Sequence, residues 1–316
     1  MILATDFGGT TLKLGMVEHG RLIARSRLDA CADHAMAERL EAVASEWESL
    51  LRRNGKSLTD CAGVALALPF IMAPKGARVL GEFGKFPGAA EIDFAAWSRS
   101  RLGLPIVMEN DLRAALLGEA AAGAARGKSD VVMLALGTGI GCAVLAEGKL
   151  LRGARNRAAT LMGHSTIAYA GTKGRCGNIG CAEDLASTAT LRQQAKARPD
   201  FSGSKLSQAA KVDYETLFAG AEQGDACAQA LLAHSLSVWS ALVQNAVLAY
   251  DPEMVVLGGG VMRRQQEIIP AITEHLSRHT PGLPLEVPVV AAQLGDDAAL
   301  LGGEVLAKHF GVALPV

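Results

Sequence analysis

The stretch that decides the fold of this chain is Ile2-Leu3-Ala4-Thr5-Asp6-Phe7-Gly8-Gly9-Thr10. A short apolar strand runs into a carboxylate and then into a glycine turn, and glycine allows backbone N–H groups to approach an anion closely. Two more short strands, Leu12–Val17 and Leu22–Arg27, are expected to follow. Apolar residues at helical spacing then predict a helix over Met36–Leu51.

The same pattern returns later in the chain. A shift of 128 residues places Gly9-Thr10 on Gly137-Thr138 and Gly20 on Gly148. The shared succession of strands and glycine turns indicates an internal duplication. The strands expected in the second copy are Val131–Leu136, Cys142–Ala146 and Lys149–Leu151.

Alternating apolar strands and helices in the rest of the chain predict an α/β protein. Further strands are expected at Ala62–Leu68, Pro105–Met108, Met254–Leu257 and Leu285–Ala292. Helices are expected at Leu112–Ala125, Ala226–Tyr250 and Asp297–Phe310. We expect an N-terminal lobe of residues 1–115, completed by a C-terminal helix at about 297–316, and a C-terminal lobe of residues 116–296, with a cleft between them.

Composition and charge exclude several classes of protein. The chain has 316 residues and a formal net charge of −1, so no overall positive field attracts nucleic acid. The sequence shows no uninterrupted apolar run long enough to cross a bilayer. A leader with a basic start and a small-residue cleavage site is also not evident. We therefore expect a cytoplasmic protein without nucleic-acid or membrane partners.

Three glycine turns are candidates for binding a nucleotide. Asp6 can hold a hydrated Mg²⁺, while Gly8, Gly9 and the hydroxyl of Thr10 can face phosphate oxygens. Either Gly-Thr turn alone could be no more than a tight hairpin turn, but a duplicated pair favours phosphate binding from two sides. The second turn is formed by Gly137, Thr138 and Gly139, and a third by Gly258, Gly259 and Gly260. The third could accept a base or ribose, or could be a tight turn between strand and helix.

Asp111 is the candidate for proton transfer. It follows a buried strand, next to Asn110, near the expected boundary of the lobes. A carboxylate there can accept the proton of an attacking hydroxyl group, and the neighbouring amide can hold an adjacent hydroxyl. Alternatively, Asp111 caps the helix that begins at Leu112, because Asp is a favoured N-cap residue. The two roles can coexist.

Seven segments of the chain, in the order in which the family has them, resemble the ROK family of sugar kinases and related repressors. The resemblance implies an actin/hexokinase-like (ribonuclease H-like) α/β fold with two lobes, duplicated βββαβα cores around a cleft, ATP with Mg²⁺, and a sugar in the cleft. The segments are Asp6–Lys13, Glu109–Asp111, Gly137–Gly141, Gly163-His164, Cys176–Glu183, Leu257–Val261 and Leu294–Leu300.

The resemblance also implies roles for single residues. Lys13 belongs to the first nucleotide-binding segment, Asn110 is a sugar contact and Asp111 is the general base. Glu183 matches a further sugar ligand, although an acid in the first turn of a helix is also stabilised by the helix dipole. His164 matches a residue that contacts sugar and binds zinc.

The chain departs from the family in its zinc loop. His164, Cys176 and Cys181 match zinc ligands, but Gly174 stands where the family has its first cysteine. Structural zinc normally has four protein ligands, so three would give a weaker site that is open to water. The alternative is that no metal binds, and that glycine turns and packing hold the loop.

The expected sugar pocket departs as well. Leu161 replaces a glutamate that binds sugar hydroxyls in the family, and Gly153–Thr160 lacks the family's glycines. Lys85 and Arg113 align with positions where asparagine is common. These changes predict that glucose fits poorly. The simpler alternative is that both basic side chains point to solvent, as most do.

Three functions are compatible with these residues. The first is an ATP-dependent sugar kinase, and the resemblance adds a homodimer as one option. The second is a sugar-responsive repressor. We do not expect it, because such a repressor carries a DNA-binding domain before the first glycine turn, and only five residues precede Asp6. The third is a catalytically inactive homologue that binds sugar or nucleotide. Intact Asp6 and Asp111 argue against the third, because binding alone needs no positioned base.

Overall fold

The computed structural model describes residues 1–73, 78–81, 84–279 and 287–312. The chain divides into two compact units. Unit 1 consists of Met1–Lys128, Leu150–Ala158 and Gln293–Val316, and unit 2 of Ser129–Lys149 and Ala159–Ala292.

Unit 1 is built on a five-stranded sheet with the order β3-β2-β1-β4-β5. β1 pairs with β2 and β2 with β3 in antiparallel fashion, whereas β4 and β5 run parallel to β1. The predicted strands are confirmed, each with small shifts at its ends. The strands are β1 (Ile2–Phe7), β2 (Thr11–Glu18), β3 (Arg21–Asp29), β4 (Gly63–Leu68) and β5 (Ile106–Asn110).

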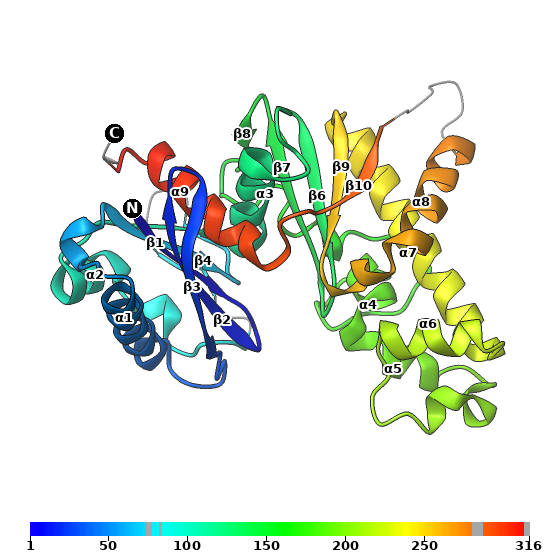
Figure 1. Cartoon of the computed structure of the whole chain (residues 1–316). Helices are drawn as coiled ribbons and strands as arrows, with labels where there is room; N and C mark the ends of the chain where they lie inside the picture. Colours follow the sequence, from blue (N-terminus) through cyan, green and yellow to red (C-terminus); the bar gives the residue numbers. More distant parts are fainter. Residues whose placement is uncertain (74–77, 82–83, 280–286, 313–316) are drawn as a thin grey trace. The chain divides into compact units, whose positions relative to one another are not determined.

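Helices cover both faces of this sheet. Successive strand residues point to opposite faces, so Leu3 packs in one cluster with Trp47 of α1 (Met36–Arg53), and Ala4 packs in another with Leu300. Leu300 belongs to the C-terminal helix α9 (Ala298–His309), which lies against β1 and β4 (Figure 1). α3 (Asp111–Ala122) packs beside α9, and α2 (Phe94–Leu102) joins the cluster of α1.

The sheet of unit 2 repeats that of unit 1. Its order is β10-β9-β6-β7-β8, so β6 has the place of β1 and the five strands follow the same sequence of neighbours. This repeat confirms the predicted duplication. The strands are β6 (Val131–Leu136), β7 (Ile140–Ala146), β8 (Lys149–Leu150), β9 (Met254–Gly258) and β10 (Val289–Ala291). The strand expected at Leu285–Ala292 is therefore shorter, and its first two residues lie outside the described part.

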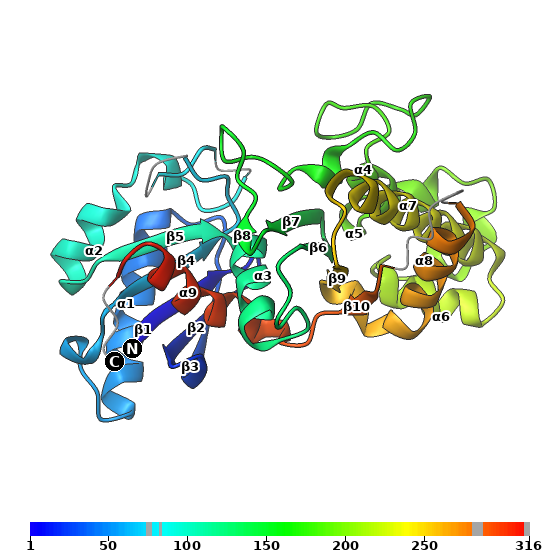
Figure 2. The same cartoon turned by 90° about the horizontal axis from the view of Figure 1, so that it is seen from above.

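The helices of unit 2 gather around the long helix α7 (Ala226–Tyr250), which has the predicted bounds. α7 contacts α6 (Tyr214–Glu222), α8 (Gln265–His279) and α4 (Ala182–Ala186) (Figure 2). Contrary to the expectation from sequence, α7 is long and apolar enough to cross a bilayer. In the described part of the chain it is the one helix that meets this test. Buried residues such as Trp239, Leu242 and Val243 nevertheless make it a core helix of unit 2.

Candidate active site

The junction of β5 and α3 presents Asp111. The N-cap of α3 is Asn110, whose Oδ1 accepts hydrogen bonds from the backbone N–H groups of Leu112 (3.2 Å) and Arg113 (3.3 Å). Capping was the alternative role for Asp111, and the structure gives it to Asn110 because Asp111 is already the first residue of the helix. Asn110 Nδ2 also donates to the carbonyl of Phe70 at 3.3 Å. Asn110 is thus fixed by the fold, and the half-buried residue Asp111 follows it at the start of α3.

Asp111 and Asp6 end up close together for a topological reason. β1, β4 and β5 are parallel neighbours, so the carboxyl ends of β1 and β5 meet at one edge of the sheet. Burial, and then the negative charge of Asp6, raise the pKa of Asp111 to about 6, against the smaller effects of the Leu112 N–H group and Lys85. A carboxylate with such a pKa can accept a proton near neutral pH.

The first glycine turn exposes its backbone. Asp6 Oδ2 pairs with Lys13 Nζ at 3.1 Å, and Lys13 also pairs with Asp296 at 3.0 Å. Burial raises the pKa of Asp6, and Lys13 offsets part of that effect. A Cβ atom at Gly8 would lie 2.7 Å from the carbonyl oxygen of Thr11, so glycine is required there. Gly9 and Thr10 are exposed, as a phosphate-binding turn requires.

Lys85 lies against this turn. Its Nζ is 3.4 Å from the position that a Cβ atom would take at Gly9. Its charge also lowers the pKa of Asp111, which counters part of the upward shift. Lys85 therefore faces the edge of the sheet that carries Asp6 and Asp111.

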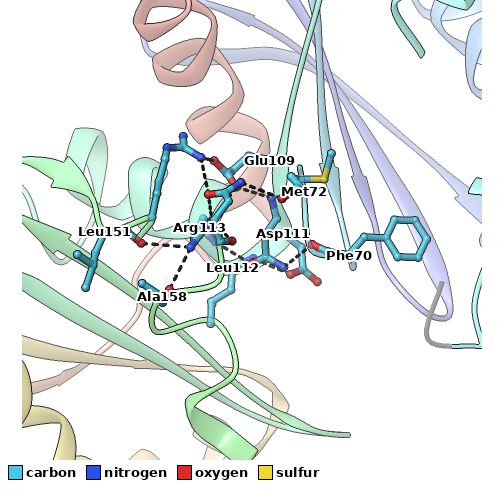
Figure 3. A network of polar contacts seen from close by, with 11 residues as sticks. Phe70, Met72, Glu109, Asp111, Leu112, Arg113, Leu151 and Ala158 are labelled. Atoms are coloured by element: carbon cyan, nitrogen blue, oxygen red, sulfur yellow. Dashed lines mark hydrogen bonds and ion pairs between the residues drawn. The ribbon is translucent and has the colours of Figure 1, made fainter. Parts of the chain in front are cut away.

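Arg113 does not point to solvent. Its side chain is buried, and it donates to three residues of one loop (Figure 3). Nη2 contacts the carbonyls of Leu151 (3.1 Å) and Ala158 (3.0 Å), and Nη1 contacts Asn156 Oδ1 (2.7 Å). The alternative that Arg113 is a solvated side chain is therefore wrong, since the first turn of α3 directs it inward.

The buried Glu109 balances this positive charge. Its carboxylate pairs with Arg113 at 3.5 Å and also with Arg152. Asn156 adopts a left-handed φ of 54° and donates from Nδ2 to the carbonyl of Met72 at 3.1 Å. The network thus fixes the loop that lacks the family's glycines. Sequence reasoning missed it, although the four-residue spacing of Glu109 and Arg113 was a usable signal.

The second glycine turn is in unit 2. The carbonyls of Gly137 and Thr138 accept hydrogen bonds from Thr188 (3.0 Å) and Ala189 (3.2 Å) at the start of α5 (Thr188–Lys196). A Cβ atom at Gly137 would meet nothing within 4 Å, so its backbone is open. At Gly139, a Cβ atom would lie 2.5 Å from Glu183 Oε2.

Glu183 therefore belongs to the surroundings of the second turn. Its Oε2 accepts a hydrogen bond from the backbone N–H of Ile140 at 2.8 Å, and Glu183 also lies in the first turn of α4. His164 Nδ1 is 4.0 Å from Glu183 Oε1 and, within the described residues, is buried without a hydrogen-bond partner. Leu161 is 41% exposed, so it contributes an apolar surface next to these groups rather than a core side chain.

The third glycine turn lies at the same end of the sheet of unit 2. β9 is parallel to β6, with Gly258 opposite Ala135. Gly259 has a φ of 91°, and a Cβ atom there would be 2.2 Å from the carbonyl oxygen of Leu136. The close approach and the positive φ both require glycine. Gly260 faces open space, so the second and third turns together present bare backbone.

The loop expected to bind zinc brings three donors together. Ligand atoms of His164, Cys176 and Cys181 lie within 4.8 Å of one another, and the two sulfur atoms are 3.5 Å apart. Burial raises the pKa of Cys181 to about 11. A Cβ atom at Gly174 would lie 2.7 Å from Asp184 Cγ, so the Asp184 carboxylate occupies the space of the missing ligand. Within the described residues this cluster offers three ligands, which fits a closed zinc site only in part.

Comparisons with known proteins agree on one family and one fold. The model of the ROK family matches residues 2–310. The chain is 27% identical to a glucokinase of Thermotoga maritima, over 98% of this chain and 97% of that protein. The structure of the ROK hexokinase of Thermus thermophilus aligns with a TM-score of 0.80 and 28% identity, over 96% of this chain and 97% of the other. The structure of a Streptomyces griseus ROK glucokinase in complex with glucose and AMPPNP aligns with a TM-score of 0.74 and 27% identity. This alignment covers 97% of this chain and 99% of the other. These likenesses confirm the predicted fold class.

Proposed function

The chain belongs to the ROK family, and from that membership we propose that it is a sugar kinase, which transfers the γ-phosphoryl group of ATP to a hydroxyl of a sugar or sugar-like substrate. Its similarity to glucokinases over nearly the whole chain supports this reaction. The observation that carries the proposal is the pair of carboxylates, Asp6 and Asp111, at the carboxyl edge of one sheet, one beside a glycine turn and the other with a pKa of about 6.

Asp111 is proposed as the general base. It accepts the proton of the attacking hydroxyl, while Asn110 and the N-terminus of α3 keep its carboxylate in place. General-base catalysis of this kind contributes about 10²–10⁴-fold to a rate. An inactive binding protein is not favoured, because a binding site would gain nothing from a proton acceptor with a raised pKa.

The nucleotide is proposed to bind at the three glycine turns. The open backbone at Gly9 and Gly137, with the Thr10 and Thr138 hydroxyls, can donate hydrogen bonds to phosphate oxygens. The bare turn at Gly258–Gly260 suits the nucleoside. Asp6 fits a hydrated Mg²⁺, because burial raises its pKa and a divalent cation would stabilise its charged form. Bound Mg²⁺ would neutralise charge on the phosphates.

The acceptor is proposed to contact Asn110, Asp111, His164 and Glu183. Nδ1 of His164, which is buried and has no hydrogen-bond partner among the described residues, could bond a substrate hydroxyl after a rotation of the ring. Leu161 offers no partner to a hydroxyl, and a hydroxyl that binding covers without giving it a partner costs roughly 1–3 kcal/mol. We therefore expect a substrate in which one hydroxyl is missing or substituted, in preference to glucose.

A panel assay tests the function. ADP release from MgATP is measured with sugars, amino sugars, deoxy sugars, polyols and sugar acids, and phosphorylated products are identified by mass spectrometry. At least one sugar-like compound should stimulate ADP release and become phosphorylated, with a kcat/KM above that of glucose. If no compound is phosphorylated, the proposed function is wrong. If glucose has the highest kcat/KM, only the interpretation of Leu161 is wrong.

A further inference from the structure

The ammonium group of Lys85 has no evident role in stabilising the described part of the fold. Its side chain is half-buried, and its Nζ lies beside the exposed backbone of Gly9. Within the described part of the chain, its ammonium makes no hydrogen bond and no ion pair. Lys13 at the same edge differs, because Asp6 and Asp296 neutralise its charge. Among the described residues, this half-buried ammonium is thus left available to an anion bound from outside the chain.

The position of Lys85 indicates which anion this is. On one side lies Gly9 of the first turn, where phosphate oxygens are proposed to bind. Asp111 is also within reach of its charge, because Lys85 counters part of the rise in the pKa of Asp111. A phosphoryl group passing from the nucleotide to a hydroxyl at Asp111 crosses the region between these two groups. All three residues belong to unit 1, so the arrangement is fixed within one compact body.

We propose that Lys85 is a further catalytic residue, whose ammonium donates hydrogen bonds to the phosphoryl group during transfer. This inference rests on the kinase function proposed above. The acceptor oxygen forms a bond to the γ-phosphorus, and the hydroxyl proton goes to Asp111. The bond from phosphorus to the β,γ-bridging oxygen breaks, and ADP leaves with the electron pair. A fixed ammonium stabilises the charge on the group in transit more than the charge of the bound reactants.

The test separates the kcat from the KM of the acceptor. Lys85→Met keeps the length of the side chain and removes its charge. We expect kcat to fall by about 10²–10³-fold, as for loss of one donor to a transition-state oxyanion, with the acceptor KM little changed. Lys85→Arg should recover much of the loss. Lys56→Met, at an exposed lysine after α1, is the matched control and should keep the parent kinetics.

The pH profile gives a second readout that a structural role would not change. Lys85 lowers the pKa of Asp111, so Lys85→Met should raise that pKa and move the acidic limb of kcat/KM to higher pH. An unchanged kcat in a folded Lys85→Met protein would overturn the inference. So would a variant in which only the acceptor KM rises, because Lys85 would then bind an anionic substituent of the acceptor.

Failure of this inference can be distinguished from failure of the proposed function. If Asp111→Asn loses activity while Lys85→Met keeps the parent kcat, the kinase function stands and the role of Lys85 is wrong. If the parent protein phosphorylates no sugar-like compound, both are wrong.

Discussion

Arg113 shows how one side chain can hold a loop next to a candidate general base. Its guanidinium contacts Leu151, Asn156 and Ala158, and it pairs with the buried Glu109. These partners lie some forty residues further along the chain, except for Glu109. No local pattern in the sequence could bring them together. Arg113 and the loop that it holds therefore form one structural unit within the described residues.

Arg113→Met should therefore destabilise unit 1. It removes one of the two cationic partners of the buried Glu109 and leaves several carbonyls without their donor, and breaking a buried ion pair costs up to about 3–5 kcal/mol. The denaturant midpoint should fall well below that of Arg52→Met, a control at an exposed position of α1. Equal midpoints for the Arg113 and Arg52 variants would contradict the structural role of the network.

At the scale of elements, α3 and α9 approach each other through glycines. A Cβ atom at Gly302 would lie 1.8 Å from the carbonyl oxygen of Ala114. Gly302→Ala should therefore destabilise the protein by about 1–3 kcal/mol, although alanine favours helices more than glycine does. Gly203→Ala is the control, because a Cβ atom there meets nothing within 4 Å. Thermal melts that show stabilisation by Gly302→Ala would contradict this close packing.

The zinc loop allows a test of ligand count. The cluster has three donors, and Asp184 lies outside it but in the way of a side chain at position 174. We therefore expect the purified protein to lose zinc readily to a weak chelator. Gly174→Cys alone should change little, because its Cβ would collide with Asp184. Gly174→Cys with Asp184→Ala should bind about one zinc per chain tightly, as four ligands do. The zinc content per chain is measured by elemental analysis after dialysis. One tightly held zinc in the parent protein would contradict this account.

The sequence predicted elements best where one local signal was strong. Apolar runs between glycine turns gave the strands, and helical spacing gave α1 and α7. α2 was not predicted, although Asp93 caps its start and Gly103 ends it in a left-handed conformation. Its nine residues bury only three side chains, so its apolar periodicity is weak. Cap residues were the usable signal there.

At the scale of the molecule, the duplication repeats the same turn in both units. Each unit carries one Gly-Thr turn after the central strand of its sheet, β1 or β6. This much followed from the repeated sequence, and the position of Asp111 at a strand end followed from the apolar strand before it. The orientations of Lys85 and Arg113 did not follow, because they depend on contacts between segments distant in sequence. The substrate preference likewise depends on side-chain placement rather than on the repeat.

The central claim is that Asp111 removes the proton of the acceptor hydroxyl, and one variant tests it most directly. Asp111→Asn keeps the size of the side chain and can still accept the hydrogen bond from Leu112, but it is a far weaker proton acceptor. The measurement is the kcat/KM for the best acceptor at pH 7.5, with melting temperature and ATP affinity as checks. We predict a loss of about 10²–10⁴-fold in a protein that folds and binds ATP like the parent. A folded Asp111→Asn protein that phosphorylates the acceptor at the parent rate would contradict the account.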